Sequence, residues 1–66
     1  MDITVNGEEK RFEGPVSVAG LLAVLALEPK KIAVERNLEI VPKSRYGETA
    51  LADGDKIEIV QFVGGG

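Results

Sequence analysis

Cysteine and histidine are both absent from this sequence of 66 residues. Without cysteine the chain can form no disulfide, no thiolate metal site and no thiol nucleophile. Without histidine it lacks the commonest general base and metal ligand of proteins. Most of the catalytic and metal-binding chemistry open to a small domain is therefore excluded, and we expect the chain to hold no metal or other cofactor of its own.

Long apolar segments and blocks of like charge are also missing. The longest uninterrupted apolar run extends from Leu21 to Leu27, far short of a membrane span. No basic segment with a cleavage site opens the chain, so we expect a cytoplasmic protein with no membrane partner. The formal net charge is −3 and charges of both signs are interspersed, which argues against a nucleic-acid partner.

Alternating apolar and polar residues predict strands at both ends of the chain. In residues 1–6 every second residue is apolar, as in a half-buried strand. Asn6-Gly7 then favours a type I′ hairpin turn, which needs positive φ at both central residues. Residues 8–13 return as the second strand, and residues 56–63 form the last one.

A helix is predicted after the first hairpin. Ser17 is a suitable N-cap, because its hydroxyl can accept a hydrogen bond from the first turn. The helix should end by Leu27-Glu28, since Pro29 disfavours helical backbone at the residue before it. The residues spaced to form one apolar helical face are Val18, Leu21, Leu22 and Leu25.

A second hairpin is predicted from residues 32–36 and 39–41, joined at Asn37-Leu38. A bulky side chain disfavours positive φ, so Leu38 predicts a type I turn with a following bulge rather than type I′. Residues 43–51 show no clear period, and we expect a loop there with one helical turn.

The order of these elements predicts an α+β fold. One helix packed across one face of a mixed sheet gives a roll. A right-handed crossover places the final strand beside the first and parallel to it, which is the β-grasp, or ubiquitin-like, arrangement. We expect residues 1–63 to form this domain and residues 64–66 to form a flexible tail.

No catalytic constellation can be assembled from the remaining polar residues. Asp53 and Asp55 are interpreted as turn residues beside Gly54, which supplies positive φ. Tyr46 is interpreted as a packed anchor. The carboxylates expected on the solvated surface are Glu8, Glu9, Glu28 and Glu48. Without a nucleophile, a base and an orienting group, we expect no enzymatic activity.

The Gly64-Gly65-Gly66 tail is the most informative feature of the sequence. Residues without a Cβ can thread a narrow channel and deliver the Gly66 carboxylate into another protein's active site. That carboxylate is ionised and unreactive at neutral pH, so a partner with ATP and Mg²⁺ must first activate it as an acyl-adenylate. The alternative is a frayed terminus, since chain ends are commonly disordered.

A partner surface is predicted next to the tail. On the last strand Val60 and Phe62 alternate with Ile57 and Ile59, which places them on the sheet face that the helix leaves open. The alternative is that Phe62 folds over the sheet edge and closes the core.

The whole chain resembles the ThiS family of sulfur carrier proteins of thiamine biosynthesis. The matching segments are Ile3–Gly7, Ala33–Asn37, Glu39–Pro42, Leu51–Asp55 and Phe62–Gly66. The resemblance implies that Gly66 is the reacting terminus, that Gly64 and Gly65 thread the partner's channel, and that Phe62 and Val63 form the contacted base of the tail.

The resemblance also implies a set of partners. A ThiF-like adenylyltransferase would activate Gly66, a sulfur donor such as a cysteine desulfurase would supply the sulfur of a thiocarboxylate, and thiazole synthase would take it. A carrier for molybdopterin or tRNA thiolation would use the same chemistry, and a ubiquitin-like modifier would instead join Gly66 to lysine. A plain binding module with an inert tail is the remaining alternative.

Overall fold

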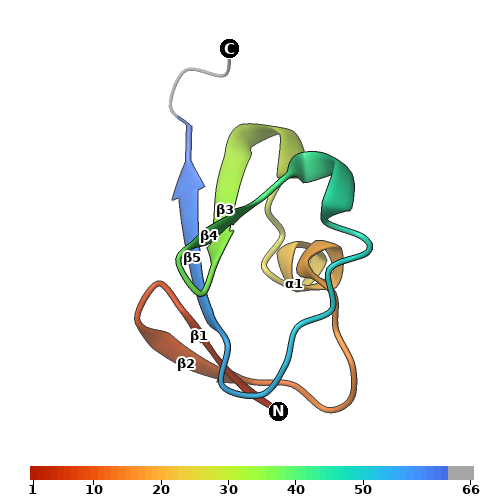
Figure 1. The fold of residues 1–66 in the computed structure, drawn as a ribbon, viewed down its shortest axis with the longest axis vertical. Helices are drawn as coiled ribbons and strands as arrows, with labels where there is room; N and C mark the ends of the chain where they lie inside the picture. The colour runs from red at the N-terminus through yellow and green to blue at the C-terminus, as the bar shows by residue number, and fades with distance from the viewer. Residues whose placement is uncertain (63–66) are drawn as a thin grey trace.

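The computed structural model describes residues 1–62, in which a mixed sheet is covered on one face by an α-helix (Figure 1). In chain order the elements are β1 (Asp2–Val5), β2 (Glu8–Arg11), α1 (Val18–Val24), the 3-10 turn η1 (Pro29–Lys31), β3 (Ile32–Arg36), β4 (Glu39–Val41), the 3-10 turn η2 (Lys43–Arg45) and β5 (Lys56–Gln61).

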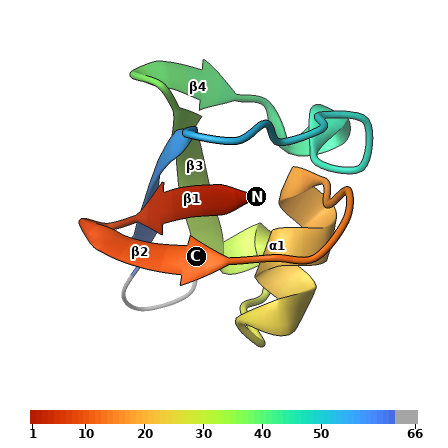
Figure 2. The same cartoon turned by 90° about the horizontal axis from the view of Figure 1, so that it is seen from below.

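The last strand lies at the centre of the sheet. The strand order is β2-β1-β5-β3-β4. β5 runs parallel to β1 and antiparallel to β3, while β1–β2 and β3–β4 are antiparallel hairpins. Figure 2 shows α1 on one side of these strands. The predicted β-grasp roll is confirmed, including the parallel pairing of the first and last strands.

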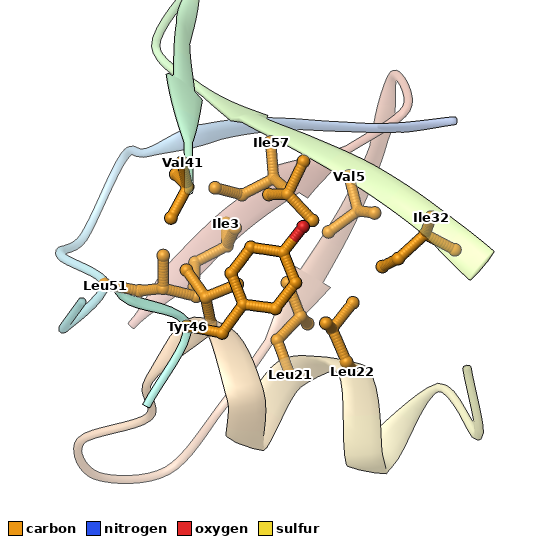
Figure 3. Packing of buried hydrophobic residues seen from close by; sticks show 11 residues of the cluster. Ile3, Val5, Leu21, Leu22, Ile32, Val41, Tyr46, Leu51 and Ile57 are labelled. Atoms are coloured by element: carbon orange, nitrogen blue, oxygen red, sulfur yellow. The ribbon is translucent and has the colours of Figure 1, made fainter. Parts of the chain in front are cut away.

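The core fills the space between α1 and the inner face of the sheet (Figure 3). Ser17 caps α1 as predicted, because its Oγ accepts a hydrogen bond of 3.1 Å from the Gly20 N–H. Tyr46 is the packed anchor that was predicted. Burial raises the pKa of its phenol, and a backbone hydrogen bond at Val34 partly lowers it again. The buried apolar residues are Ile3, Val5, Val18, Leu21, Leu22, Ile32, Val34, Val41, Tyr46, Leu51 and Ile57.

The end of α1 lies within the range that the sequence predicts. Its last residue is Val24, which lies before the latest end that Pro29 allows, at Leu27-Glu28. Ala26 adopts a left-handed conformation with φ of 57°. The amides of Ala26 and Leu27 then donate back to carbonyls of the last helical turn at 3.1 and 2.9 Å, in the pattern of a Schellman motif. The helix therefore stops through its own C-terminal cap, before the proline can act on it.

The turn between β3 and β4 also differs from the prediction. Asn37 and Leu38 have φ of 52° and 70°, as a type I′ turn requires, so the predicted type I turn with a bulge is wrong. The Asn37 carboxamide stabilises this conformation, since its oxygen accepts from the Lys56 N–H at 2.9 Å and its nitrogen donates to Asp55 at 3.0 Å. Leu38 adopts positive φ with its side chain 90% exposed.

Asp55 is a buried carboxylate rather than an ordinary turn residue. Its side chain accepts hydrogen bonds from Arg36 Nε at 2.8 Å, from Asn37 Nδ2 at 3.0 Å and from the Ala52 N–H at 2.8 Å. Burial alone would raise the pKa of Asp55, but these three donors and the guanidinium charge outweigh it and hold the pKa below its ordinary value. Gly54 has the predicted positive φ, 86°.

We expect this carboxylate to make the fold sensitive to acid. The folded-state pKa of Asp55 lies below the unfolded-state value of about 3.9, so its stabilisation is present above that pH and is lost as the pH falls through the folded-state pKa. Asp55→Asn should lower the free energy of unfolding by about 3 kcal/mol at pH 7. The difference from the wild type should shrink toward pH ~2 in urea unfolding experiments.

Asp53→Asn is the matched control, because Asp53 is exposed and accepts one hydrogen bond, from the Asp2 N–H at 2.7 Å. It should change the free energy of unfolding by less than about 1 kcal/mol. Equal losses in the two variants, or an Asp55→Asn deficit that stays constant into acid, would contradict the assignment.

Candidate functional site

The candidate site begins on β5, which leads to Phe62, the last described residue. β5 is a central strand and pairs with β3 from Ile57 opposite Arg36 to Gln61 opposite Ile32. On its other side, β1 pairs with the start of β5. The strand that carries the site is therefore fixed by neighbours on both sides.

Asn6 continues the support of β5 beyond the end of β1. Its side-chain oxygen accepts from the Ile59 N–H at 2.7 Å, and its nitrogen donates to the Ile59 carbonyl at 3.1 Å. The carboxamide thus pairs with both backbone groups of Ile59, as a neighbouring strand residue would. Sequence reasoning identified Asn6 only as a turn residue, and its φ of 49° confirms that part.

Phe62 is fixed by the two 3-10 turns. Its N–H donates to the Lys31 carbonyl in η1 at 2.8 Å. The Nζ of Lys43, in η2, lies 5.5 Å from the centroid of the Phe62 ring and donates to the Lys30 carbonyl at 3.0 Å. This is cation–π geometry. Sequence reasoning missed Lys43, because it lies in a segment without period and meets Phe62 only through the tertiary fold.

The expected alternation along β5 is confirmed. Ile57 is fully buried and Ile59 packs partly against the core, whereas Val60 and Phe62 are 59% and 51% exposed. Phe62 therefore does not close the core, and that alternative is wrong. The other predicted site residues, Val63 and residues 64–66, lie outside the described residues.

The described chain outside this site contains neither a cluster of metal ligands nor a helix that could span a membrane. Nowhere in residues 1–62 do three or more potential metal ligands gather. None of the helices in this range is long and apolar enough to cross a membrane. The four carboxylates predicted on the surface are exposed, and Glu8 and Glu28 form surface ion pairs with Lys10 and Lys31.

The chain matches a known family along nearly its whole length. The model of the ThiS family covers residues 3–66. The chain is 46% identical over 65 residues to the sulfur carrier protein ThiS of Bacillus subtilis (strain 168), covering 97% of this chain and 98% of that protein. It also superimposes on the crystal structure of the thiamine biosynthesis protein ThiS from Geobacter metallireducens with a TM-score of 0.85 and 33% identity, over 100% of both chains.

Other relatives are much longer proteins. The chain is 54% identical over 66 residues to a thiazole synthase of Paramagnetospirillum magneticum and 44% identical over 66 residues to one of Magnetococcus marinus. All of this chain is covered in both matches, but it spans only 20% of the length of either relative. A segment similar to this chain is therefore part of proteins named thiazole synthase.

The exposure of Phe62 predicts a small role in stability. Phe62→Ala should lower the free energy of unfolding by less than about 1 kcal/mol, since an exposed cation–π contact contributes about 0.5–1 kcal/mol. Ile57→Ala on the same strand is the contrasting variant and should cost about 2–5 kcal/mol, because Ile57 is fully buried. Urea unfolding monitored by circular dichroism measures both. Comparable losses would place Phe62 in the core.

Proposed function

The chain belongs to the ThiS family, and we propose that it is a sulfur carrier protein of thiamine biosynthesis whose Gly66 carboxylate bears the sulfur. The observation that carries the proposal is the family match itself, which runs through the glycine tail to residue 66. The similarity to the sulfur carrier ThiS of Bacillus subtilis over 98% of that protein supports it. The composition agrees, since a chain without cysteine has no thiol on which to carry sulfur.

The proposed chemistry has two steps at the carboxyl group of Gly66. A carboxylate oxygen of Gly66 attacks the α-phosphorus of ATP, pyrophosphate leaves, and an acyl-adenylate forms. A sulfur nucleophile then attacks the acyl carbon, AMP leaves, and a C–S bond replaces a C–O bond. A ThiF-like adenylyltransferase holds ATP and Mg²⁺, and a donor such as a cysteine desulfurase supplies the sulfur. Where that sulfur arrives as a persulfide, the acyl disulfide that forms is cleaved by a thiol reductant, which becomes a disulfide and leaves the thiocarboxylate on Gly66. The carrier contributes position, by presenting its terminus in line with the phosphorus.

The fold is consistent with a carrier that positions its terminus while partner enzymes perform the chemistry. In the proposal, the described residues serve as a fixed base and as a docking surface. In the proposal, Gly64 and Gly65 enter a narrow channel of the partner while Val60, Phe62 and Val63 contact its rim. The cycle takes place in the cytoplasm. Thiazole synthase is the proposed acceptor of the sulfur, as the long relatives of that name support.

Mass spectrometry of the intact protein tests the proposed function. After incubation with the adenylyltransferase, ATP and a sulfur donor, the chain should gain about 16 Da as sulfur replaces oxygen at Gly66. A protein modifier would instead give adducts of much higher mass. An unchanged mass in the presence of active partners would contradict the carrier proposal. If the sulfur-loaded chain supports molybdopterin formation or tRNA thiolation but not thiazole formation, the carrier belongs to another pathway.

Gly65→Val is the matched variant for this experiment. The added side chain must pass the same channel as the terminus, so pyrophosphate release should be blocked while the unfolding midpoint is unchanged. Normal turnover by this variant would show that no close-fitting channel surrounds the tail.

The docking role of Phe62 is tested separately by binding. Phe62→Ala should weaken the affinity for the adenylyltransferase by about 1–3 kcal/mol, as for an aromatic anchor at an interface. Isothermal titration calorimetry measures this difference. Val24→Ala, at an exposed apolar residue of α1, is the control and should leave the affinity unchanged. Unchanged affinity of Phe62→Ala would move the docking surface away from β5.

A further inference from the structure

Two glutamates face each other at the centre of the open sheet face. Glu35 on β3 and Glu58 on β5 are direct partners in the antiparallel register. Their neighbours along the strands, Val34 and Ile57, are buried on the α1 side. Because side chains alternate along a strand, Glu35 and Glu58 both project from the opposite face.

This pair opposes folding, since like charges placed directly across two strands destabilise a sheet. No ion pair within residues 1–62 relieves it. The four ion pairs of the described chain are Lys10–Glu8, Arg11–Asp2, Lys31–Glu28 and Arg36–Asp55. Lys56, on the same face of β5, forms no ion pair with either glutamate in this range. Within residues 1–62 no cation therefore balances the charge of the two glutamates, although Lys56 lies on the same face.

The glutamates lie among exposed apolar side chains. Ile40 on β4 is the register partner of Glu35 on its other side and is 75% exposed. Val60 follows Glu58 on the same face of β5, opposite Ala33. At the end of the β3–β4 hairpin, Leu38 is exposed on a backbone conformation that a branched apolar residue disfavours. Three unfavourable features thus coincide on or beside one face, as at sites where stability is given up for binding.

We propose that Glu35 and Glu58 together bind the guanidinium of an arginine on thiazole synthase, with apolar side chains of that partner packing on Ile40 and Val60. A guanidinium presents a planar fork of donors that can bind two carboxylates, and it is weakly hydrated enough to enter an apolar surface. The assignment of the partner rests on the proposed function and on the long thiazole synthase relatives that contain a segment like this chain.

The charge of the chain disfavours other occupants. A second copy placed face to face would bring two more glutamates to the pair, and the net charge of −3 adds to that repulsion. Nucleic acid and anionic membranes carry the same sign of charge as the face. A cationic, partly apolar protein surface is the complement that remains. Its contact with Val60 would also hold the partner next to Phe62, from which the tail continues.

The test is the affinity of the double variant Glu35→Gln/Glu58→Gln for purified thiazole synthase of the same organism. Calorimetric titration should show binding at least about tenfold weaker than wild type, with a smaller dependence on salt. The unfolding midpoint of the free variant should be equal to or above that of wild type, because the repulsion has been removed. A merely structural role for the glutamates predicts the opposite change in stability.

Glu13→Gln/Glu48→Gln is the matched control, since it removes two exposed carboxylates outside the strands and gives the same net charge. Its affinity should stay within about twofold of wild type, as for exposed charges remote from an interface. Wild-type affinity in the Glu35→Gln/Glu58→Gln variant, or an equal loss in the control, overturns the proposal.

Thiocarboxylate formation by the wild-type chain separates this proposal from the proposed function. If the chain acquires the sulfur but does not bind thiazole synthase, the carrier role stands and the docking proposal is overturned. If it binds thiazole synthase through the glutamates but never acquires the sulfur, the carrier chemistry fails and the docking surface stands.

Discussion

The carboxylate of Asp55 links the segments of the chain whose relative positions determine where β5 lies. It accepts from Arg36 at the end of β3, from Asn37 in the following turn and from the Ala52 N–H before β5 begins. The carbonyl of the same residue accepts from the Thr4 N–H of β1 at 3.0 Å. A buried charge is tolerated only with such partners, so a shift of any of these segments would leave it unsatisfied. Asp55 therefore helps to set the register of the central strand.

Two asparagines extend the same constraint along β5. Asn37 binds the backbone at Lys56 and Asn6 binds it at Ile59, and both adopt the positive φ of a hairpin turn. A short amide side chain suits both tasks, because asparagine tolerates left-handed backbone and its carboxamide can replace a peptide group. Each turn thus closes its own hairpin and also holds the strand that carries the candidate site. As a result Phe62, which follows β5 and contacts Lys43, has a fixed position at the end of the sheet.

The sequence predicted the features that depend on local pattern. The alternation of apolar and polar residues predicted the strands, and the i, i+3, i+4 spacing predicted the inner face of α1. Alternation along β5 predicted the exposure of Val60 and Phe62. It failed where distant residues decide the outcome. Nothing local distinguishes Asp55 from Asp53, since the burial of Asp55 depends on Arg36 across the sheet. Leu38 was assigned to the wrong turn because the contacts of its neighbour Asn37, which favour type I′, are tertiary.

The two faces of the sheet meet different requirements. On the inner face every large apolar residue is packed and the buried carboxylate is satisfied, so this face supplies the stability of the fold. The open face, opposite α1, carries an unrelieved glutamate pair and exposed isoleucine, valine and phenylalanine side chains, which contribute little to the stability of the isolated domain. A small domain has little stability to spare, so such features are expected to persist only where binding depends on them. In the proposed carrier role the chemistry takes place in partner enzymes, so recognition by those partners falls to the surface of this domain. The mixture of acidic and apolar groups on the open face complements a cationic, partly apolar surface.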